Sequence, residues 1–99
     1  MSDKSTLIVT AQPDANEMES VQGYLQGVLP LLTKAGGKPV KRLAVDEVIH
    51  GQPSGMVLVM EFESAAVIKN LFDSEDYAAL IPARDRGFSQ MNILVTSDM

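Results

Sequence analysis

The stretch from His50 to Gly87 constrains the fold of this chain more than any other segment. It opens with a turn rich in Gly and Pro (GQPSG) and continues with an apolar strand from Met56 to Glu63. Ser64 is placed to cap a helix that runs to about Phe72, and Ser74 is placed to cap a shorter one. A strand that leads directly into capped helices predicts a mixed α+β domain, in which helices pack on a sheet.

The N-terminal half supplies a similar unit. Thr6 to Ala11 is short, β-branched and apolar, which predicts a strand. Asp14 lies three residues before Glu17, the spacing of a capping box. The helix that follows has an apolar stripe at three- and four-residue steps, made of Met18, Val21, Leu25, Val28, Leu29 and Leu32. Pro30 is expected to bend or loosen its last turns, and Gly36-Gly37 to end it.

The remaining segments complete the order of elements. Lys38 to Ile49 reads as a long strand whose apolar phase changes, so a bulge or bend is expected within it. The turn at Gly51 to Gly55 then predicts an antiparallel hairpin. Pro82 is expected to stop the second short helix, and Asn92 to Thr96 to form the last strand. The order is βαββαβ. It predicts one ferredoxin-like domain over residues 1–99, with a four-stranded antiparallel sheet and helices on one face.

The strand that begins at Met56 is apolar on both sides. Met56, Leu58, Met60 and Phe62 point to one face, whereas Val57 and Val59 point to the other. Ile8 is similarly opposed to Leu7 and Val9. Helices cover only one face, so we expect a second copy of the chain to cover the other and form a homodimer. The alternative is that these residues are isolated exposed apolar side chains, which are common.

Composition excludes several classes of function. The net charge is −5, with 13 acidic and 8 basic residues, which argues against binding to nucleic acid or to an anionic membrane. The absence of cysteine excludes disulfides and thiolate sites, and a single histidine cannot build a usual zinc site. The sequence has no apolar run long enough to span a bilayer and no apolar signal segment at its start. A cytoplasmic location is expected.

Several of these residues also resemble a known family, the uncharacterised domain of unknown function 1330. The resemblance covers nearly the whole chain, and its more specific parts are the Phe62-x-Ser64 junction, the Ser74-x-x-Tyr77 step and the Arg84-Asp85 pair. Glu63 and Ala35 depart from residues common in that family. Such proteins are similar to the dimeric α/β-barrel superfamily, in which two ferredoxin-like sheets pack face to face. The resemblance therefore implies a dimeric α/β barrel, in a superfamily that includes small monooxygenases, isomerases and decarboxylases.

His50 is the first candidate for chemistry because it is the only histidine. Any imidazole acid–base step near neutral pH must use it. It shares a strand face with Asp46 only if no bulge separates the two. The alternative is a structural or exposed histidine beside a turn.

Arg84 and Asp85 form the second candidate site. Arg84 can hold a carboxylate in bidentate fashion, and Asp85 can orient it or act as a catalytic base. The alternative is a structural ion pair. Tyr77 and Tyr24 are candidates to present hydroxyls to a ligand, or else lie in the core with their tips in water. Arg42 is a candidate second anion anchor, although it is most simply placed on the outer face of its strand.

These candidates leave two classes of function open. The first is a homodimer that binds a small organic molecule, acting as a cofactor-independent enzyme on an organic acid or aromatic if it is an enzyme at all. The second is a non-catalytic dimeric interaction or accessory protein. No sequence feature implies a flavin, haem or nucleotide, so no cofactor is expected.

Overall fold

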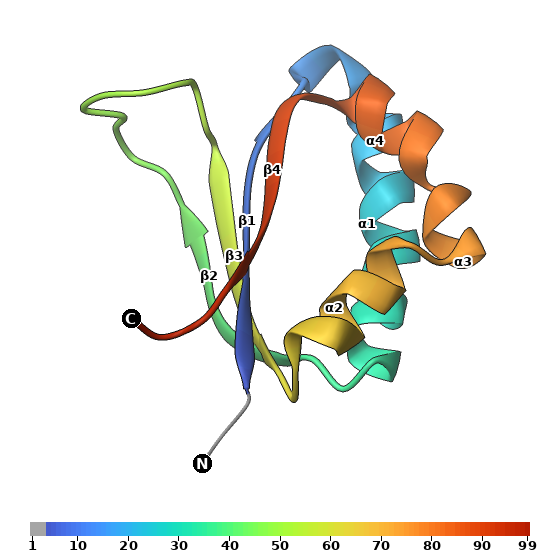
Figure 1. The fold of residues 1–99 in the computed structure, drawn as a ribbon. Helices are drawn as coiled ribbons and strands as arrows, with labels where there is room; N and C mark the ends of the chain where they lie inside the picture. Colours follow the sequence, from blue (N-terminus) through green and yellow to red (C-terminus); the bar gives the residue numbers. More distant parts are fainter. Residues whose placement is uncertain (1–3) are drawn as a thin grey trace.

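The computed structural model describes residues 4–99 (Figure 1). The expectation about a signal segment rests partly on the first three residues, which lie outside this range. The elements in chain order are β1 (Ser5–Pro13), a 3-10 turn (Ala15–Glu17), α1 (Met18–Lys34), β2 (Lys38–Ala44), β3 (Met56–Phe62), α2 (Ala65–Phe72), α3 (Glu75–Ala78), α4 (Ile81–Gly87) and β4 (Phe88–Thr96).

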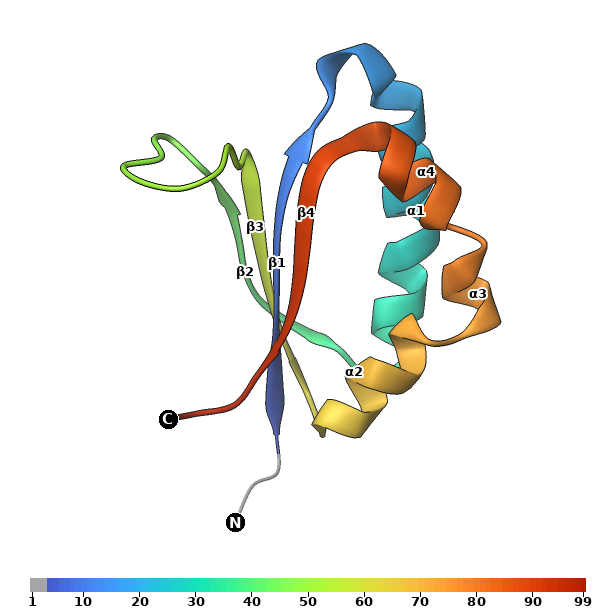
Figure 2. The same ribbon diagram turned by 45° about the horizontal axis from the view of Figure 1, so that its top comes forward.

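One antiparallel sheet with strand order β2-β3-β1-β4 forms the first layer of the molecule. The helices form a second layer against one face of that sheet, and the other face carries no helix (Figures 1 and 2). The two central strands, β1 and β3, are flanked by the edge strands β4 and β2. This arrangement confirms the predicted α+β, ferredoxin-like architecture.

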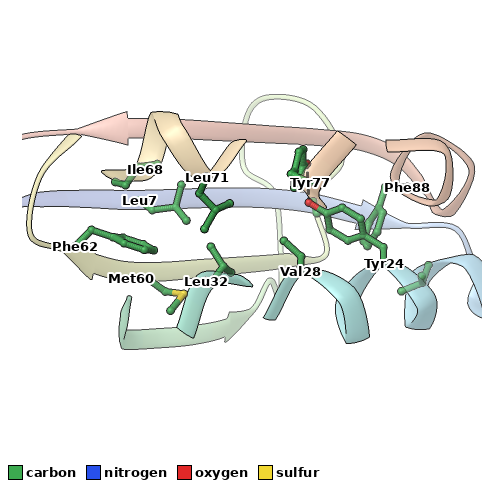
Figure 3. Close-up of a cluster of buried hydrophobic side chains, with 12 residues drawn as sticks. Leu7, Tyr24, Val28, Leu32, Met60, Phe62, Ile68, Leu71, Tyr77 and Phe88 are labelled. Carbon is green, nitrogen blue, oxygen red and sulfur yellow. Dashed lines mark hydrogen bonds between the residues drawn. The ribbon is translucent and has the colours of Figure 1, made fainter. Parts of the chain in front are cut away.

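The core lies between the two layers (Figure 3). Alternate residues of β1 and β3 point toward the helices, among them Leu7, Met60 and Phe62. From α1, Val28 and Leu32 meet them, one helical turn apart. Every second residue of the strands and the apolar stripe of α1 therefore face the same interior. In this way the sequence specifies the two layers.

The start of α1 differs from the prediction. Asp14 does act as a cap, but it accepts from the backbone N–H of Asn16 and so caps the 3-10 turn. Glu17 makes no capping bond and instead accepts a hydrogen bond from Arg86 of α4 at 3.2 Å. The predicted capping box is therefore wrong, because Glu17 is used to pair α1 with α4. Pro30 lies on the exposed side of α1 and the helix continues past it to Lys34.

The second strand is shorter than predicted. Its register with β3 shifts between Pro39 and Lys41, which confirms the expected irregularity. The strand ends at Ala44, and residues 45–55 form an extended loop. Since the pairing segment of β3 begins only at Met56, residues beyond Ala44 have no partner strand and cannot extend the ladder. His50 and Asp46 accordingly lie in this loop, and not on one strand face.

Pro82 does not stop the helical region, contrary to the expectation. It lies in the first turn of α4, where a missing backbone N–H breaks no hydrogen bond. Helix α4 consequently contains Arg84, Asp85 and Arg86, and ends at Gly87. The last strand begins directly afterwards at Phe88, four residues before the predicted start at Asn92.

The helix-free face of the sheet has an apolar centre. Ile8 is paired with Val59 on one side and with Leu94 on the other, and Val57 is paired with Leu43. These side chains alternate with the core-facing ones, so they point away from the helices. Leu43 and Leu94 are 46% and 47% exposed. We call this set, Ile8, Leu43, Val57, Val59 and Leu94, the outer apolar patch.

Candidate functional site

Two buried tyrosines form the centre of the candidate site. Tyr24 comes from α1 and Tyr77 from α3, and their hydroxyl oxygens lie 2.8 Å apart. Figure 3 shows both rings in the core, with the Tyr24 hydroxyl directed toward Tyr77. Edge-to-face contacts fix the rings, Tyr24 against Phe88 and Tyr77 against Phe72. Tyr77 is only 2% exposed. The alternative of tyrosine tips in water is therefore wrong for both residues.

Local sequence positions Tyr77 for this role. The Ser74 hydroxyl accepts a hydrogen bond from the backbone N–H of Tyr77 and donates to the carbonyl of Leu71. It thereby caps α3 and ties it to the end of α2. The Ser74-x-x-Tyr77 step is thus a capping unit that sets the direction of the tyrosine ring.

Arg84 joins the tyrosine pair to the surface. Its Nη1 donates to the Tyr77 hydroxyl at 3.2 Å, and its Nε donates to Asp85 Oδ1 at 3.0 Å. The guanidinium carbon also lies 5.9 Å from the centre of the Tyr77 ring. The Arg84 side chain is partly buried and the Asp85 side chain is largely exposed. Four of the six predicted site residues, namely Tyr24, Tyr77, Arg84 and Asp85, therefore form one continuous network.

Two members of the network, Tyr24 and Arg84, have raised pKa values. Burial raises the pKa of Tyr24 far above its ordinary value, and the hydrogen bond with Tyr77 adds to the effect. The hydrogen bond to Tyr77 also raises the pKa of Arg84, and Asp85 contributes in the same direction. Tyr24 is therefore a neutral hydroxyl and Arg84 a cation near neutral pH.

One hydroxyl proton of the tyrosine pair is uncommitted. Arg84 can only donate, so the Tyr77 oxygen acts as its acceptor. The two hydroxyls share a single hydrogen bond, which uses one of their two protons. Neither hydroxyl donates to any other group within residues 4–99. One proton, on Tyr24 or on Tyr77 depending on the direction of the shared bond, is thus left for an external acceptor.

The two tyrosines line pockets of different size and character. Tyr24 lines an apolar cavity of about 30 Å³, together with Phe88 and Met91 and residues of α1 and β3. This volume is about that of one water molecule. Tyr77 instead lines an open groove of about 350 Å³ between α2, α4 and β4, which we call the α2 groove; its lining residues are Lys69, Phe72, Asp73, Tyr77, Ile81, Arg84, Ile93 and Val95.

A second groove adjoins the first along β4. It has a volume of about 480 Å³ and runs between α4 and the start of β4; its lining residues are Arg84, Asp85, Phe88, Ser89, Gln90, Met91 and Ile93. We call it the α4 groove. Arg84 and Ile93 line both grooves, so the guanidinium lies where the two meet. The α2 groove combines two cations, Arg84 and Lys69, with apolar walls, which is the composition expected of a site for an apolar organic anion.

The other two predicted site residues lie elsewhere. His50 is exposed in the loop 45–55, lines neither groove, and makes no hydrogen bond or ion pair with the part of the chain that is described. Arg42 is paired with Leu58, whose side chain faces the helices. Arg42 therefore lies on the helix side of the edge strand β2, and the expectation that it lies on the outer face is wrong. Neither residue joins the tyrosine–arginine network.

Sequence reasoning did not identify Lys69 and Ile93, which line the α2 groove. Lys69 is one of several exposed lysines on amphipathic elements, and Ile93 is one of many strand isoleucines, valines and leucines. Their only signal is position: Lys69 is in the last turn of α2 and Ile93 faces the helices from the edge strand β4. These positions can be recognised as part of a groove only once the register of the sheet is known.

The model of one protein family, described as a domain of unknown function (DUF1330), matches residues 6–99. The chain belongs to this family. The match covers every helix and nearly all of every strand of this DUF1330 chain. It agrees with the resemblance carried by Phe62-x-Ser64, Ser74-x-x-Tyr77 and Arg84-Asp85. No curated protein matches the chain.

Solved structures share the fold of this DUF1330 protein at low sequence identity. The protein RPA0582 of unknown function from Rhodopseudomonas palustris is 13% identical, with a TM-score of 0.81 over 100% of this chain and 85% of its own. A dimeric protein of unknown function with a ferredoxin-like fold from Bacteroides fragilis is 11% identical, with a TM-score of 0.63 over 98% of both chains. The hydroxynitrile lyase from Passiflora edulis is 12% identical, with a TM-score of 0.72 over 100% of this chain and 98% of its own. At these identities the likeness concerns the fold alone.

Membrane-spanning helices and clusters of metal ligands are both missing from the described residues. Across residues 4–99, no helix is both long enough and apolar enough to cross a membrane. Within the same residues, no three His, Asp or Glu side chains gather as ligands of a metal ion.

Replacing Tyr24 with Phe should change how stability depends on pH. Near pH 8 wild type should be more stable by about 1 kcal/mol, the value of one hydrogen bond. The raised pKa of Tyr24 in the folded state means that the unfolded chain loses this proton first. Wild-type stability should therefore fall by up to about 1.4 kcal/mol for each pH unit above about 10, relative to Tyr24→Phe. Urea unfolding of both proteins between about pH 8 and 11 measures this. If the free energy of unfolding changed with pH in the same way in both proteins, Tyr24 would not be held protonated in the folded state.

Proposed function

We propose that this DUF1330 protein is a homodimer that binds a small apolar organic acid in the α2 groove of each copy. The ligand carboxylate accepts hydrogen bonds from Arg84 and from the Tyr77 hydroxyl, which lines this groove and is free to donate when Tyr24 donates to it. Its apolar body lies against Phe72, Ile81 and Ile93. The observation that carries this proposal is the Tyr24–Tyr77–Arg84 network, which presents a fixed cation and a spare donor at the wall of an open groove.

Geometry and charge support a carboxylate in particular. Arg84 is oriented from two directions, by the Tyr77 hydroxyl and by Asp85, so little side-chain freedom is left to lose on binding. Lys69 adds a second positive charge at the same groove, and Asp73 is the only acidic residue among the described residues that line it. The groove volume of about 350 Å³ suits a molecule of the size of a substituted benzoate or a short fatty acid.

The homodimer is supported by the outer apolar patch. Its side chains occupy the centre of a sheet face that no helix covers (Figures 1 and 2). A symmetric contact buries the same patch of each copy, and a small domain gains stability from such burial. The Bacteroides fragilis protein of similar fold is itself described as dimeric. That description supports the proposal by analogy of fold.

Ligand binding at this site does not by itself imply catalysis. Asp85 is the carboxylate paired with the guanidinium and is the residue we propose for any proton abstraction, but its ion pair with Arg84 also suits a purely orienting role. The competing function is that of a non-catalytic dimeric accessory protein. It is favoured by the exposed position of His50, the only imidazole in the chain.

Arg84→Gln should remove most of the preference of the groove for anions. Phenylacetate and phenylacetamide serve as a matched pair of probes, because they differ in charge and little in shape. Wild type should bind phenylacetate about ten times more tightly than the amide, the effect of one charge-assisted hydrogen bond. In Arg84→Gln the preference should fall to about threefold or less, because only the exposed Lys69 still offers a positive charge. Calorimetric titration of both probes provides the measurement.

Arg86→Gln is the matched control for this experiment. Arg86 lies two residues further along α4 and pairs with Glu17, away from both grooves. The substitution changes net charge by the same amount, so a general electrostatic effect would appear in both variants. Equal loss in both variants, or no preference for phenylacetate in wild type, would contradict the proposed site.

A further inference from the structure

The β2–β3 loop, residues 45–55, leaves the sheet on its helix-free side. In both views it curls away from the helix layer, toward the side on which the outer apolar patch is exposed (Figures 1 and 2). The base of the loop is held in place, because the backbone N–H of Val45 donates to Gly55 and that of Gly55 donates to Ala11 of β1. The loop therefore projects from a fixed base in a defined direction.

Two large apolar side chains of this loop are exposed. Ile49 is 93% exposed and Val48 is 40% exposed, although both belong to residue types that are usually buried. One copy of the chain offers them no core to enter. Leu43, a member of the outer apolar patch, lies two residues before the base of the loop, so the patch and the loop follow one another along the chain.

From these features we propose that the loop 45–55 is an arm that packs on a second copy of the chain, with Ile49 as its anchor. The inference rests on the proposed homodimer and adds to it a contact outside the sheet. A twofold contact must be self-complementary. The arm carries Asp46 and Glu47, whereas the helix-free face of β2 carries Lys41, so acidic and basic groups are both present on the surface that would meet itself. A nucleic acid would offer only negative charge, which the acidic arm disfavours.

The consequence for His50 is that its surroundings depend on assembly. It is the next residue after the anchor, and within one copy it is exposed. In the dimer it would lie at the contact between the arm and the second copy. A role for His50 in ligand binding would then require that copy.

The arm can be tested with a single introduced thiol, because the chain has no cysteine of its own. Ile49→Cys should react with a disulfide reagent at least about ten times more slowly in the dimer than when Val59→Lys is added to separate the copies. Gln26→Cys, on the exposed side of α1, is the matched control and should react at one rate in both backgrounds.

Light scattering on the same samples distinguishes a failure of the proposed arm from a failure of the proposed homodimer. If the protein is dimeric and the Ile49→Cys thiol reacts as fast as it does in the separated copies, the arm is wrong and the sheet contact stands. If the protein is a monomer without Val59→Lys, the proposed homodimer fails and the arm fails with it. An Ile49→Asp variant should raise the dimer dissociation constant at least about tenfold; an unchanged constant would also overturn the arm.

Discussion

Gly87→Ala should destabilise the protein by about 1–3 kcal/mol, the usual cost of forcing an extra group into a packed contact. A Cβ at this position would lie 2.8 Å from the backbone nitrogen of Val21 and 3.1 Å from the carbonyl carbon of Ser20. Both are backbone atoms of α1 and cannot rotate away. The Gly87 carbonyl also accepts a hydrogen bond from the Asp14 backbone at 2.8 Å, so α4 has little freedom to move.

Gly87→Ala should affect the candidate site as well as the stability of the fold. Arg84 lies one turn before Gly87 on α4 and bonds Tyr77 of α3, whose hydroxyl in turn bonds Tyr24 of α1. A shift of α4 relative to α1 would strain this chain of bonds, whose Arg84–Tyr77 member is already 3.2 Å long. We therefore expect weaker binding of phenylacetate as well as a lower urea midpoint.

Gly23→Ala is the internal control for this prediction. Gly23 lies within α1, and a Cβ added there would meet no atom within 4 Å from outside its own helix. Alanine there should stabilise the protein by about 0.5–1 kcal/mol through helix propensity alone. Both variants should be unfolded at the same protein concentration, since dimerisation makes stability depend on concentration. If Gly87→Ala is also neutral or stabilising, α4 does not contact α1 as closely as described.

Val59→Lys should convert the proposed dimer to a monomer. Val59 lies in the middle of the outer apolar patch, paired with Ile8 of β1 and Lys41 of β2. In a symmetric dimer each copy would bring one unpaired ammonium into the apolar contact, and the effective cost is several kcal/mol for each ion. We expect at least about a hundredfold rise in the dissociation constant, measured by light scattering over a dilution series.

Gln26→Lys is the control for the dimer prediction. It adds the same charge to the exposed side of α1, on the opposite layer of the molecule, and should leave the dimer intact. A circular dichroism spectrum checks that Val59→Lys still folds. A folded Val59→Lys protein that remains dimeric at the wild-type dissociation constant would rule out the sheet face as the contact.

The architecture could be predicted because its signals are local. The apolar run from Met56 to Phe62, the stripe of α1 and the caps Ser64 and Ser74 each depend on residues within a few positions of one another. The sequence-based prediction of the fold fails where a partner that is distant in the sequence determines the local structure. Glu17 pairs with Arg86 from α4 instead of capping α1, and β2 ends where β3 offers no further partner.

The candidate site was predictable in four of its members, Tyr24, Tyr77, Arg84 and Asp85, and not in its geometry. Arg84 and Asp85 stand out as adjacent charges, but the contact between Tyr24 and Tyr77 joins residues 53 positions apart. No pattern in either helix indicates that these two hydroxyls meet. Their contact follows from how α1 and α3 pack, and the grooves beside Arg84 follow from the placement of β4 as an edge strand.

The most direct test of the proposed site is to map where phenylacetate binds by NMR. Amide and arginine Nε–H signals of wild type should be followed during titration. We expect the largest shifts on Tyr77, Arg84 and Ile93, around the α2 groove, and an Arg84 Nε–H signal that moves with the same dissociation constant. Shifts centred on the outer apolar patch or on residues 45–55, or none at saturating phenylacetate, would contradict the proposed site.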